Sequence, residues 1–188
     1  MGKSRSITYN SPVVLTFVIL SFAVMVANYL TAGLSNKLLF MTYHSSLASP
    51  LTYVRMFTHV LGHAGWSHYI GNMMYLLLLG PMLEEKYGSR ALIEVILVTG
   101  LVTGIVTWVL FPGIALCGAS GVVFAFIMMT SFTSFKEGEI PLTVILVAII
   151  FIGQQVYEGL LVQDDISNMG HILGGIVGAT AGYTLNKK

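Results

Sequence analysis

The sequence carries very little charge for its length. Lys, Arg, Asp and Glu together make up 9% of its 188 residues, whereas a typical soluble domain carries about 25%. So few charged side chains could not cover a water-exposed surface, and the mean hydropathy of +0.82 agrees with this. Because 55% of the residues are hydrophobic, the composition excludes a soluble enzyme, a disordered segment and a nucleic-acid-binding protein. It indicates an integral membrane protein.

Cysteine and net charge are also scarce. With a single cysteine, Cys117, the chain cannot form an intramolecular disulfide or a CxxC metal site. The net charge of +1 gives no sign of a polyanionic partner. Glycine, in contrast, is abundant at 20 residues. In a membrane protein this favours close packing of helices.

The apolar residues fall into windows of the length that a membrane helix needs. About 20 mostly apolar residues are required to cross about 30 Å of hydrocarbon as a helix. The windows do not alternate strictly between apolar and polar residues, which argues against a β-barrel. We therefore predict an all-α membrane protein, a single membrane domain over residues 1–188 built as a bundle of six transmembrane helices. The predicted spans are residues 12–31, 68–84, 91–111, 120–135, 141–161 and 170–186.

A long connection, residues 32–67, separates the first two spans. It is too long for a plain turn, and its segments Lys37–Met41 and Tyr53–Phe57 are expected to form short helices in the membrane interface. Six spans place both termini on one side, where basic residues are concentrated. This distribution predicts a multi-pass protein with cytoplasmic termini and an external long connection. The short loops favour a prokaryotic cell membrane, and the membrane of an organelle stays open as the alternative. The basic residues on the inner side are Lys3, Arg5, Lys86, Arg90, Lys136, Lys187 and Lys188, against Lys37 and Arg55 outside.

Ser120 lies between glycines at the predicted start of the fourth span, in Gly118-Ala119-Ser120-Gly121. The first turn of a helix has backbone N–H groups without intrahelical partners and the positive end of the helix dipole. Both stabilise an oxyanion, and the glycines let another backbone or a substrate approach closely. Alone, the string also fits a serine that only caps the helix. Cys117 is a weaker candidate nucleophile because no base is spaced for it.

His171 lies at the predicted start of the sixth span and shares a helix face with Gly174, Gly178 and Gly182. Such a face packs closely on a neighbouring helix, so His171 could also be a hydrogen-bonded residue of that packing interface. Ser120 and His171 each lie about 15 residues from the inner end of their spans, which places both roughly 22 Å up in the membrane. A serine becomes a nucleophile when a neutral histidine is adjacent to it.

Two residue pairs with i, i+4 spacing lie at the start of the second span and just before it. His68 and Asn72 project from one helix face, and both can donate hydrogen bonds to an oxyanion. His59 and His63 have the same spacing. An alternative is a zinc site formed by the three histidines, with Glu84 as a distant fourth ligand. The sequence lacks a His-Glu-x-x-His motif, and Glu84 falls on the opposite side of the membrane, so a metal site is disfavoured.

Together these motifs resemble the rhomboid family of intramembrane serine proteases. The resemblance runs from about Arg55 to Leu185, so it covers most of the chain, and it rests on five motifs in family order. They are Arg55 with His59-x-x-x-His63, His68-x-x-x-Asn72, Glu84-x-x-x-Gly88, Gly118-x-Ser120-Gly121, and His171-x-x-Gly174-x-x-x-Gly178.

The resemblance implies a rhomboid-like bundle of six helices and an endopeptidase that cuts transmembrane segments of other membrane proteins. It implies that Ser120 and His171 form a catalytic dyad, and that His68, Asn72 and the backbone N–H of Ser120 form the oxyanion hole. No metal or other cofactor is implied. The implied partners are the lipid bilayer and transmembrane protein substrates, without nucleic acid. The implied supporting residues are Gly118, Gly121, Phe124, Gly174 and Gly178.

Two positions depart from the family pattern. Phe124 stands where the family often has Tyr, so a ring can pack on His171 but the hydroxyl is absent, and Val54-Arg55 stands where the family commonly has Trp-Arg. Two other functions stay open: a rhomboid-like pseudoprotease that binds membrane proteins without cutting them, and a small transporter that uses the external histidines. The polar residues of the fifth span either line a water-filled cavity or reach the interface. They are Gln154, Gln155 and Glu158.

Overall fold

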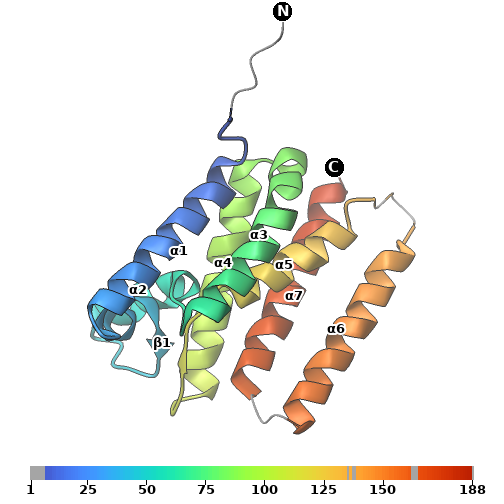
Figure 1. Ribbon diagram of the computed structural model, residues 1–188. Helices are drawn as coiled ribbons and strands as arrows, with labels where there is room; N and C mark the ends of the chain where they lie inside the picture. Colours follow the sequence, from blue (N-terminus) through green and yellow to red (C-terminus); the bar gives the residue numbers. More distant parts are fainter. Residues whose placement is uncertain (1–6, 135, 137–138, 162–164, 188) are drawn as a thin grey trace, which may run out of the picture.

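The computed structural model describes residues 7–134, 136, 139–161 and 165–187, and these are mostly helical (Figure 1). The side chains of residues 155, 156 and 158–167 lie outside this description, as do the predictions for Lys3, Arg5, residue 135, Gln155, Glu158 and Lys188. The elements in chain order are α1 (Pro12–Leu30), η1 (Asn36–Phe40), β1 (Thr42–Tyr43), α2 (Pro50–Thr58), η2 (His59–Leu61), α3 (Trp66–Tyr87), α4 (Ser89–Leu110), β2 (Ala115–Leu116), α5 (Ser120–Ser131), α6 (Leu142–Leu161) and α7 (Asp165–Asn186).

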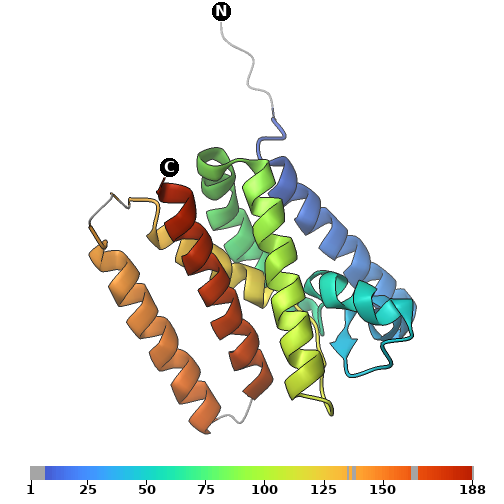
Figure 2. The ribbon, with the colours of Figure 1, turned by 180° about the vertical axis from the view of Figure 1, so that it is seen from behind.

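The long helices form a bundle with α5 at its centre, in contact with α3, α4, α6 and α7 (Figures 1 and 2). The most deeply buried apolar side chains accordingly belong to α5 and to the helices packed on it. α1 begins and α7 ends at the same end of the bundle, while α6 lies at its edge in both views. The core includes Val122, Phe126 and Met129 of α5, Leu76 and Leu83 of α3, and Leu92 of α4.

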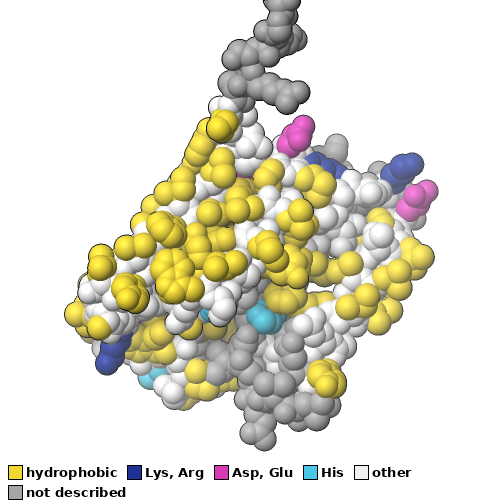
Figure 3. Space-filling model, viewed as in Figure 1, with side chains coloured by type: hydrophobic (Ala, Val, Ile, Leu, Met, Phe, Trp, Pro, Cys, Tyr) yellow, Lys and Arg dark blue, Asp and Glu magenta, His cyan; other side chains and the backbone are white. Residues whose placement is uncertain are grey.

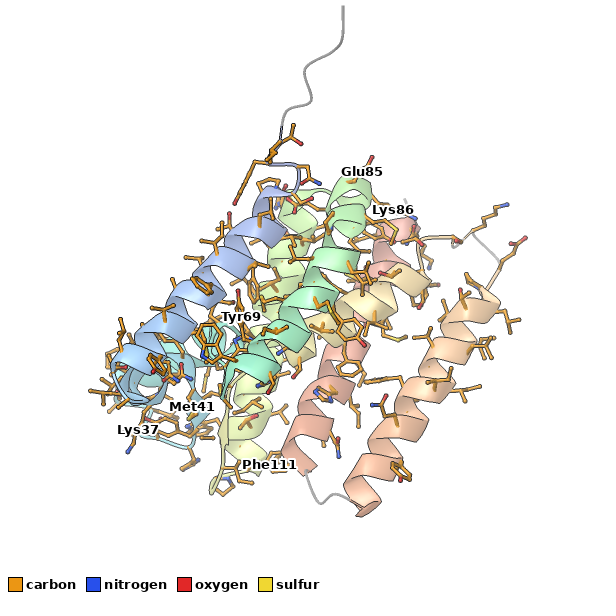
Figure 4. All side chains as sticks on the ribbon, in the orientation of Figure 1. Lys37, Met41, Tyr69, Glu85, Lys86 and Phe111 are labelled. Carbon is orange, nitrogen blue, oxygen red and sulfur yellow. The ribbon has the colours of Figure 1, made fainter. Side chains whose placement is uncertain are left out.

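The face of the bundle seen in Figure 3 is largely apolar, and the charged side chains visible on it lie toward its ends. Figure 4 places Glu85 and Lys86 at the end where α3 stops, and Lys37 at the opposite end. In the part of the chain that the structure describes, two helices, α1 and α4, are long and apolar enough to cross a membrane. The apolar stretches Ser120–Ser131 and Leu142–Gln154 are shorter. Among the described residues, therefore, these two helices alone meet the prediction of six helices long enough to span.

The boundaries of α5 and α7 each differ from the predicted span at one end. α5 stops at Ser131, short of residue 135, where Phe132 N–H donates to Met129 O and Thr133 N–H donates to Thr130 O in tighter turns. α7 begins at Asp165, not at residue 170, so His171 lies in its second turn. The apolar pattern does not predict this turn because three of its four residues are polar, Asp165, Ser167 and Asn168, although such residues are favoured at helix starts.

α3 also extends beyond the predicted 68–84, from Trp66 to Tyr87, and ends at Gly88, whose φ is +83°. Near this end, the Glu84 carboxylate accepts hydrogen bonds from Val13 N–H at 3.0 Å and Val14 N–H at 3.1 Å. These are first-turn N–H groups of α1, which a carboxylate satisfies and stabilises. Glu84 therefore caps α1, which is not the metal-ligand role considered from the sequence.

The connection between α1 and α3 is folded onto the bundle. The short helices expected over Lys37–Met41 and Tyr53–Phe57 are present as η1 and α2. β1 pairs antiparallel with β2, with Thr42 opposite Leu116. Because β2 leads directly into the loop before Ser120, this pairing attaches the long connection to the segment that carries the serine.

Arg55 anchors this connection from inside. Its side chain is only 5% exposed, and its guanidinium donates to the Tyr43 hydroxyl at 2.8 Å and to the Ser45 hydroxyl at 3.0 Å. The guanidinium also lies over the Tyr43 ring, 4.4 Å from its centroid. The neighbouring Val54 is exposed. Arg55 thus holds the loop without a tryptophan at position 54.

Candidate active site

α3 presents one polar face to a cavity of about 470 Å³. His68, Gly71, Asn72 and Tyr75 line it together because their spacing follows the helical repeat. Tyr69, the residue after His68, marks this part of α3 in Figure 4. Asn72 is 7% exposed, and its amide nitrogen has no hydrogen-bond partner among the described residues. A buried donor of this kind is costly unless an acceptor arrives.

α5 forms the opposite wall of the cavity with Ser120, Val123, Phe124 and Ile127. Ser120 is the first residue of α5, and the N-cap position belongs to Ala119. The alternative that Ser120 only caps the helix is therefore wrong. Val123 N–H donates to Ala119 O, which closes the first turn. The N–H groups of the three residues before Val123, including that of Ser120, have no acceptor one turn earlier.

Gly118 fits the loop before α5 against His68. Its φ of +139° is one that residues with side chains rarely adopt. A Cβ at this position would also lie 2.6 Å from Cε1 and 2.9 Å from Nε2 of His68. In addition, Gly118 N–H donates to His59 O at 3.0 Å. The loop is thereby held between the imidazole of His68 and the backbone of His59.

Glycines bring α7 into backbone contact with α5. A Cβ on Gly174 would overlap the backbone of Gly121, and a Cβ on Gly178 would overlap that of Ala125. Because Gly174 lies one turn after His171 and Gly121 directly follows Ser120, this contact brings the serine and the histidine to the same place. Both side chains line the 470 Å³ cavity.

The His171 ring packs on an aromatic pair. Its centroid lies 4.3 Å from that of Phe124, with the two planes 40° apart. Phe124 in turn lies 4.5 Å from Phe151 of α6. Gln154, also from α6, completes the cavity wall. The part of the lining that the structure describes includes no Asp or Glu, so its chemistry rests on hydroxyl, imidazole and amide groups.

The histidines that precede α3 have structural partners. The His59 Nδ1–H donates to Arg55 O at 3.1 Å, and His59 Nε2 lies 3.1 Å from Thr103 Oγ1. The His63 ring stands edge-on to that of His68, 5.2 Å between centroids. Burial lowers the pKa of His59 to about 4, and burial followed by the nearby His68 lowers that of His63 to about 4. Both rings are therefore neutral at pH 7.

Neither alternative site gains support from the described residues. They contain no group of three or more His, Cys, Asp or Glu side chains placed to hold a metal ion. Cys117 does not line the cavity. Burial raises the pKa of its thiol to about 11, which keeps it protonated and a poor nucleophile.

Comparison with known proteins identifies the family. The model of the rhomboid domain matches residues 50–188. This chain belongs to the rhomboid family. It is therefore a membrane protein, as the composition indicated, and the resemblance seen in its motifs is confirmed.

The chain is similar to two curated rhomboid proteins that are longer than the region it matches. It is 32% identical over 162 residues to rhomboid-related protein 2 of Mus musculus. The aligned region covers 74% of this chain and 53% of that protein. It is 25% identical over 139 residues to the chloroplastic rhomboid-like protein 11 of Arabidopsis thaliana. The aligned region covers 66% of this chain and 50% of that protein. The chain thus spans about half the length of these relatives.

Three of the five rhomboid motifs meet at one cavity, and several other cavity residues lie between them. Ser120, His171, His68, Asn72 and Phe124 all line one cavity, while Gly118, Gly121, Gly174 and Gly178 make the close contacts around it. The helical repeat counted from His68 and Ser120 could have identified most of the residues that sequence analysis did not single out. Those residues are Ser67, Gly71, Tyr75, Val123 and Ile127.

Proposed function

We propose that this rhomboid domain is an intramembrane serine endopeptidase, with Ser120 as the nucleophile and His171 as its base. The observation that carries the proposal is the single cavity into which α3, α5 and α7 bring Ser120, His171, His68 and Asn72. A serine nucleophile needs a histidine base and a group of oxyanion donors, and side chains of each kind line this cavity.

The proposed reaction follows from the role that each group can take. His171 accepts the proton of Ser120 Oγ as the oxygen attacks the substrate carbonyl. The resulting oxyanion accepts hydrogen bonds from His68, Asn72 and the backbone N–H of Ser120. His171 then gives the proton to the leaving amine, and water hydrolyses the acyl-enzyme by the same route.

Asn72 gives this assignment its clearest support within the oxyanion hole. Its amide nitrogen is buried beside the cavity without a partner among the described residues. An oxyanion that forms only during the reaction would satisfy this donor at the moment when its stabilisation lowers the barrier. His68 faces the same cavity and is held by Gly118, so both donors approach from one face of α3.

We further propose that α1, α3, α4, α5, α6 and α7 cross the cell membrane, with both termini cytoplasmic. In support of this orientation, α1 begins and α7 ends at one end of the bundle, the end at which Lys86 also lies, and basic residues concentrate on the cytoplasmic side of membrane proteins. The 12 residues of α5 span about 18 Å, less than the hydrocarbon thickness of about 30 Å. Ser120 would then lie below the outer surface, under the external α1–α3 connection.

The proposed substrates are transmembrane segments of other proteins. α6 lies at the edge of the bundle and contributes Gln154 to the cavity, so displacement of α6 would open a lateral path from the lipid. A helical substrate must unwind locally before its carbonyl can be attacked, because helical peptide groups are hydrogen-bonded within the segment. Substrates with small or helix-breaking residues near the cut are therefore expected.

Labelling with a fluorescent fluorophosphonate tests the proposal directly. The purified wild-type protein is expected to label, and the Ser120→Ala and His171→Ala variants are not. Near-identical thermal unfolding of the three proteins shows that the variants are folded. Absence of labelling in folded wild-type protein would reject the protease and favour the pseudoprotease.

A further inference from the structure

One narrow apolar stripe holds α6 on the bundle. Val144, Val147, Ala148 and Phe151 are spaced i, i+3, i+4 and i+7, which places them on one helix face. Among the described side chains of α6, Val144 and Phe151 are the buried ones, each 9% exposed. Val144 packs in a small cluster with Met128 and Phe132. Phe151 lies at the end of the stripe nearer the cavity.

Phe151 contacts both helices that carry the proposed dyad. Its ring lies 4.5 Å from that of Phe124, with an angle of 36° between the planes. Its Cε1 atom occupies the space beside Gly175, where an added Cβ would lie only 2.8 Å away. Gly175 is four residues after His171, and Phe124 is four residues after Ser120. The ring of Phe151 therefore packs one helical turn from each proposed catalytic residue.

Phe124 transmits this packing to the histidine. The rings of Phe151, Phe124 and His171 follow one another at centroid distances of 4.5 Å and 4.3 Å. Phe124 has no hydroxyl, so its influence on His171 comes from the position of its ring. That position is limited on one side by Phe151, and removal of Phe151 would leave space into which the Phe124 ring can turn.

We infer that Phe151 is a positioning residue for His171, so that the packing of α6 and the reactivity of the serine are coupled. The inference rests on the proposed function, since it concerns the orientation of the base. It also has a consequence for substrate access. A segment that displaces α6 would separate Phe151 from Phe124, so that the His171 ring is no longer held in position. The full reactivity of Ser120 would return when α6 packs on the bundle again.

Two matched variants of α6 test the inference. Phe151→Ala and Val144→Ala each remove a buried side chain from the same stripe, but of the two side chains only Phe151 touches Phe124. The rate constant of fluorophosphonate labelling is measured across a pH series, together with thermal unfolding. Phe151→Ala is expected to label about 10-fold more slowly, with a changed pH of half-maximal labelling, because a misplaced base loses efficiency steeply. Val144→Ala is expected to stay within about 2-fold of wild type, because it leaves the base in place.

Two further variants separate the effect of the aromatic ring from that of the volume that it fills. Phe151→Leu keeps most of the apolar volume and is expected to fold even if Phe151→Ala does not, while its labelling rate and pH profile change in the same direction. Phe151→Tyr keeps the aromatic ring and is expected to label with the rate and pH dependence of the wild-type protein.

The results distinguish the inference from the proposed function. If wild-type protein labels, but Phe151→Ala and Phe151→Leu have the rate and pH profile of Val144→Ala, then Phe151 only stabilises α6 and the inference is overturned. If wild-type protein is as inert as Ser120→Ala, the proposed function fails, and the inference fails with it.

Discussion

Gly121 of α5 and Gly174 of α7 are in direct backbone contact, and the Cα and carbonyl carbon of Gly121 occupy the space that a side chain at Gly174 would need. The contact is repeated one turn later by Ala125 and Gly178. Because Ser120 precedes Gly121 and His171 lies one turn before Gly174, the distance between the two helices controls the distance between the proposed nucleophile and base.

Gly174→Ala is expected to separate α5 from α7. Overpacking of a close contact costs about 1–3 kcal/mol of unfolding free energy, and here it also moves His171 away from Ser120. We therefore expect fluorophosphonate labelling to fall further than the loss of stability explains. Gly153→Ala on α6 is the control, because a Cβ there has no atom within 4 Å. Equal labelling by the two variants would show that the glycine contact does not determine the distance between Ser120 and His171.

Gly118→Ala is expected to displace the imidazole of His68. The new Cβ would lie 2.6 Å from His68 Cε1, and the φ of +139° adds backbone strain of about 1–3 kcal/mol. The measurement is the cleavage or labelling rate of folded protein. Gly113→Ala serves as the control in the same connection, because a Cβ there meets no atom within 4 Å. If Gly118→Ala retains full activity, then His68 is not held in place by this loop.

The helices could be predicted from the sequence because each long apolar window leaves few alternatives to a helix in a membrane. The end of α5 could not, because the tighter turn at Phe132, whose N–H donates to Met129 O, interrupts an apolar window that is predicted to continue to residue 135. The first turn of α7 was missed for a related reason, since its polar residues interrupt the apolar pattern before Gly170.

The site was predictable where its residues share one helix, as His68 and Asn72 do at i, i+4. Contacts between segments distant in the chain have no periodic signal. The packing of Gly118 on His68, the ring of Phe151 behind Phe124 and the pairing of Thr42 with Leu116 are of this kind. They depend on how separate segments are placed, which the local pattern does not specify.

Acid is expected to destabilise the fold through His59 and His63. Their pKa values are lowered by burial to about 4 in the folded protein, against about 6.5 in the unfolded chain. Between these pH values the unfolded state binds more protons, so the free energy of unfolding rises with pH and is progressively lost as the pH falls from about 6.5 toward 4. Thermal unfolding across this window measures the effect.

Two variants show whether these histidines are responsible. His63→Gln removes one of the titrating groups, so the dependence of unfolding temperature on pH should become shallower. Val60→Ala removes a buried but uncharged neighbour, so it should lower the unfolding temperature by a similar amount at every pH. An unchanged pH dependence in His63→Gln would show that His63 does not contribute to acid lability.

Asn72→Ala is expected to lower the cleavage rate on the order of 10²-fold, the usual cost of removing one oxyanion donor. Its amide nitrogen is buried and without a partner among the described residues, so its loss breaks no hydrogen bond of that nitrogen and should cost little stability. The donor would act on charge that develops in the transition state, so kcat should fall while KM stays near the wild-type value. Steady-state cleavage of a transmembrane substrate separates the two constants. An increase in KM at constant kcat would instead place Asn72 in substrate binding, outside the oxyanion hole.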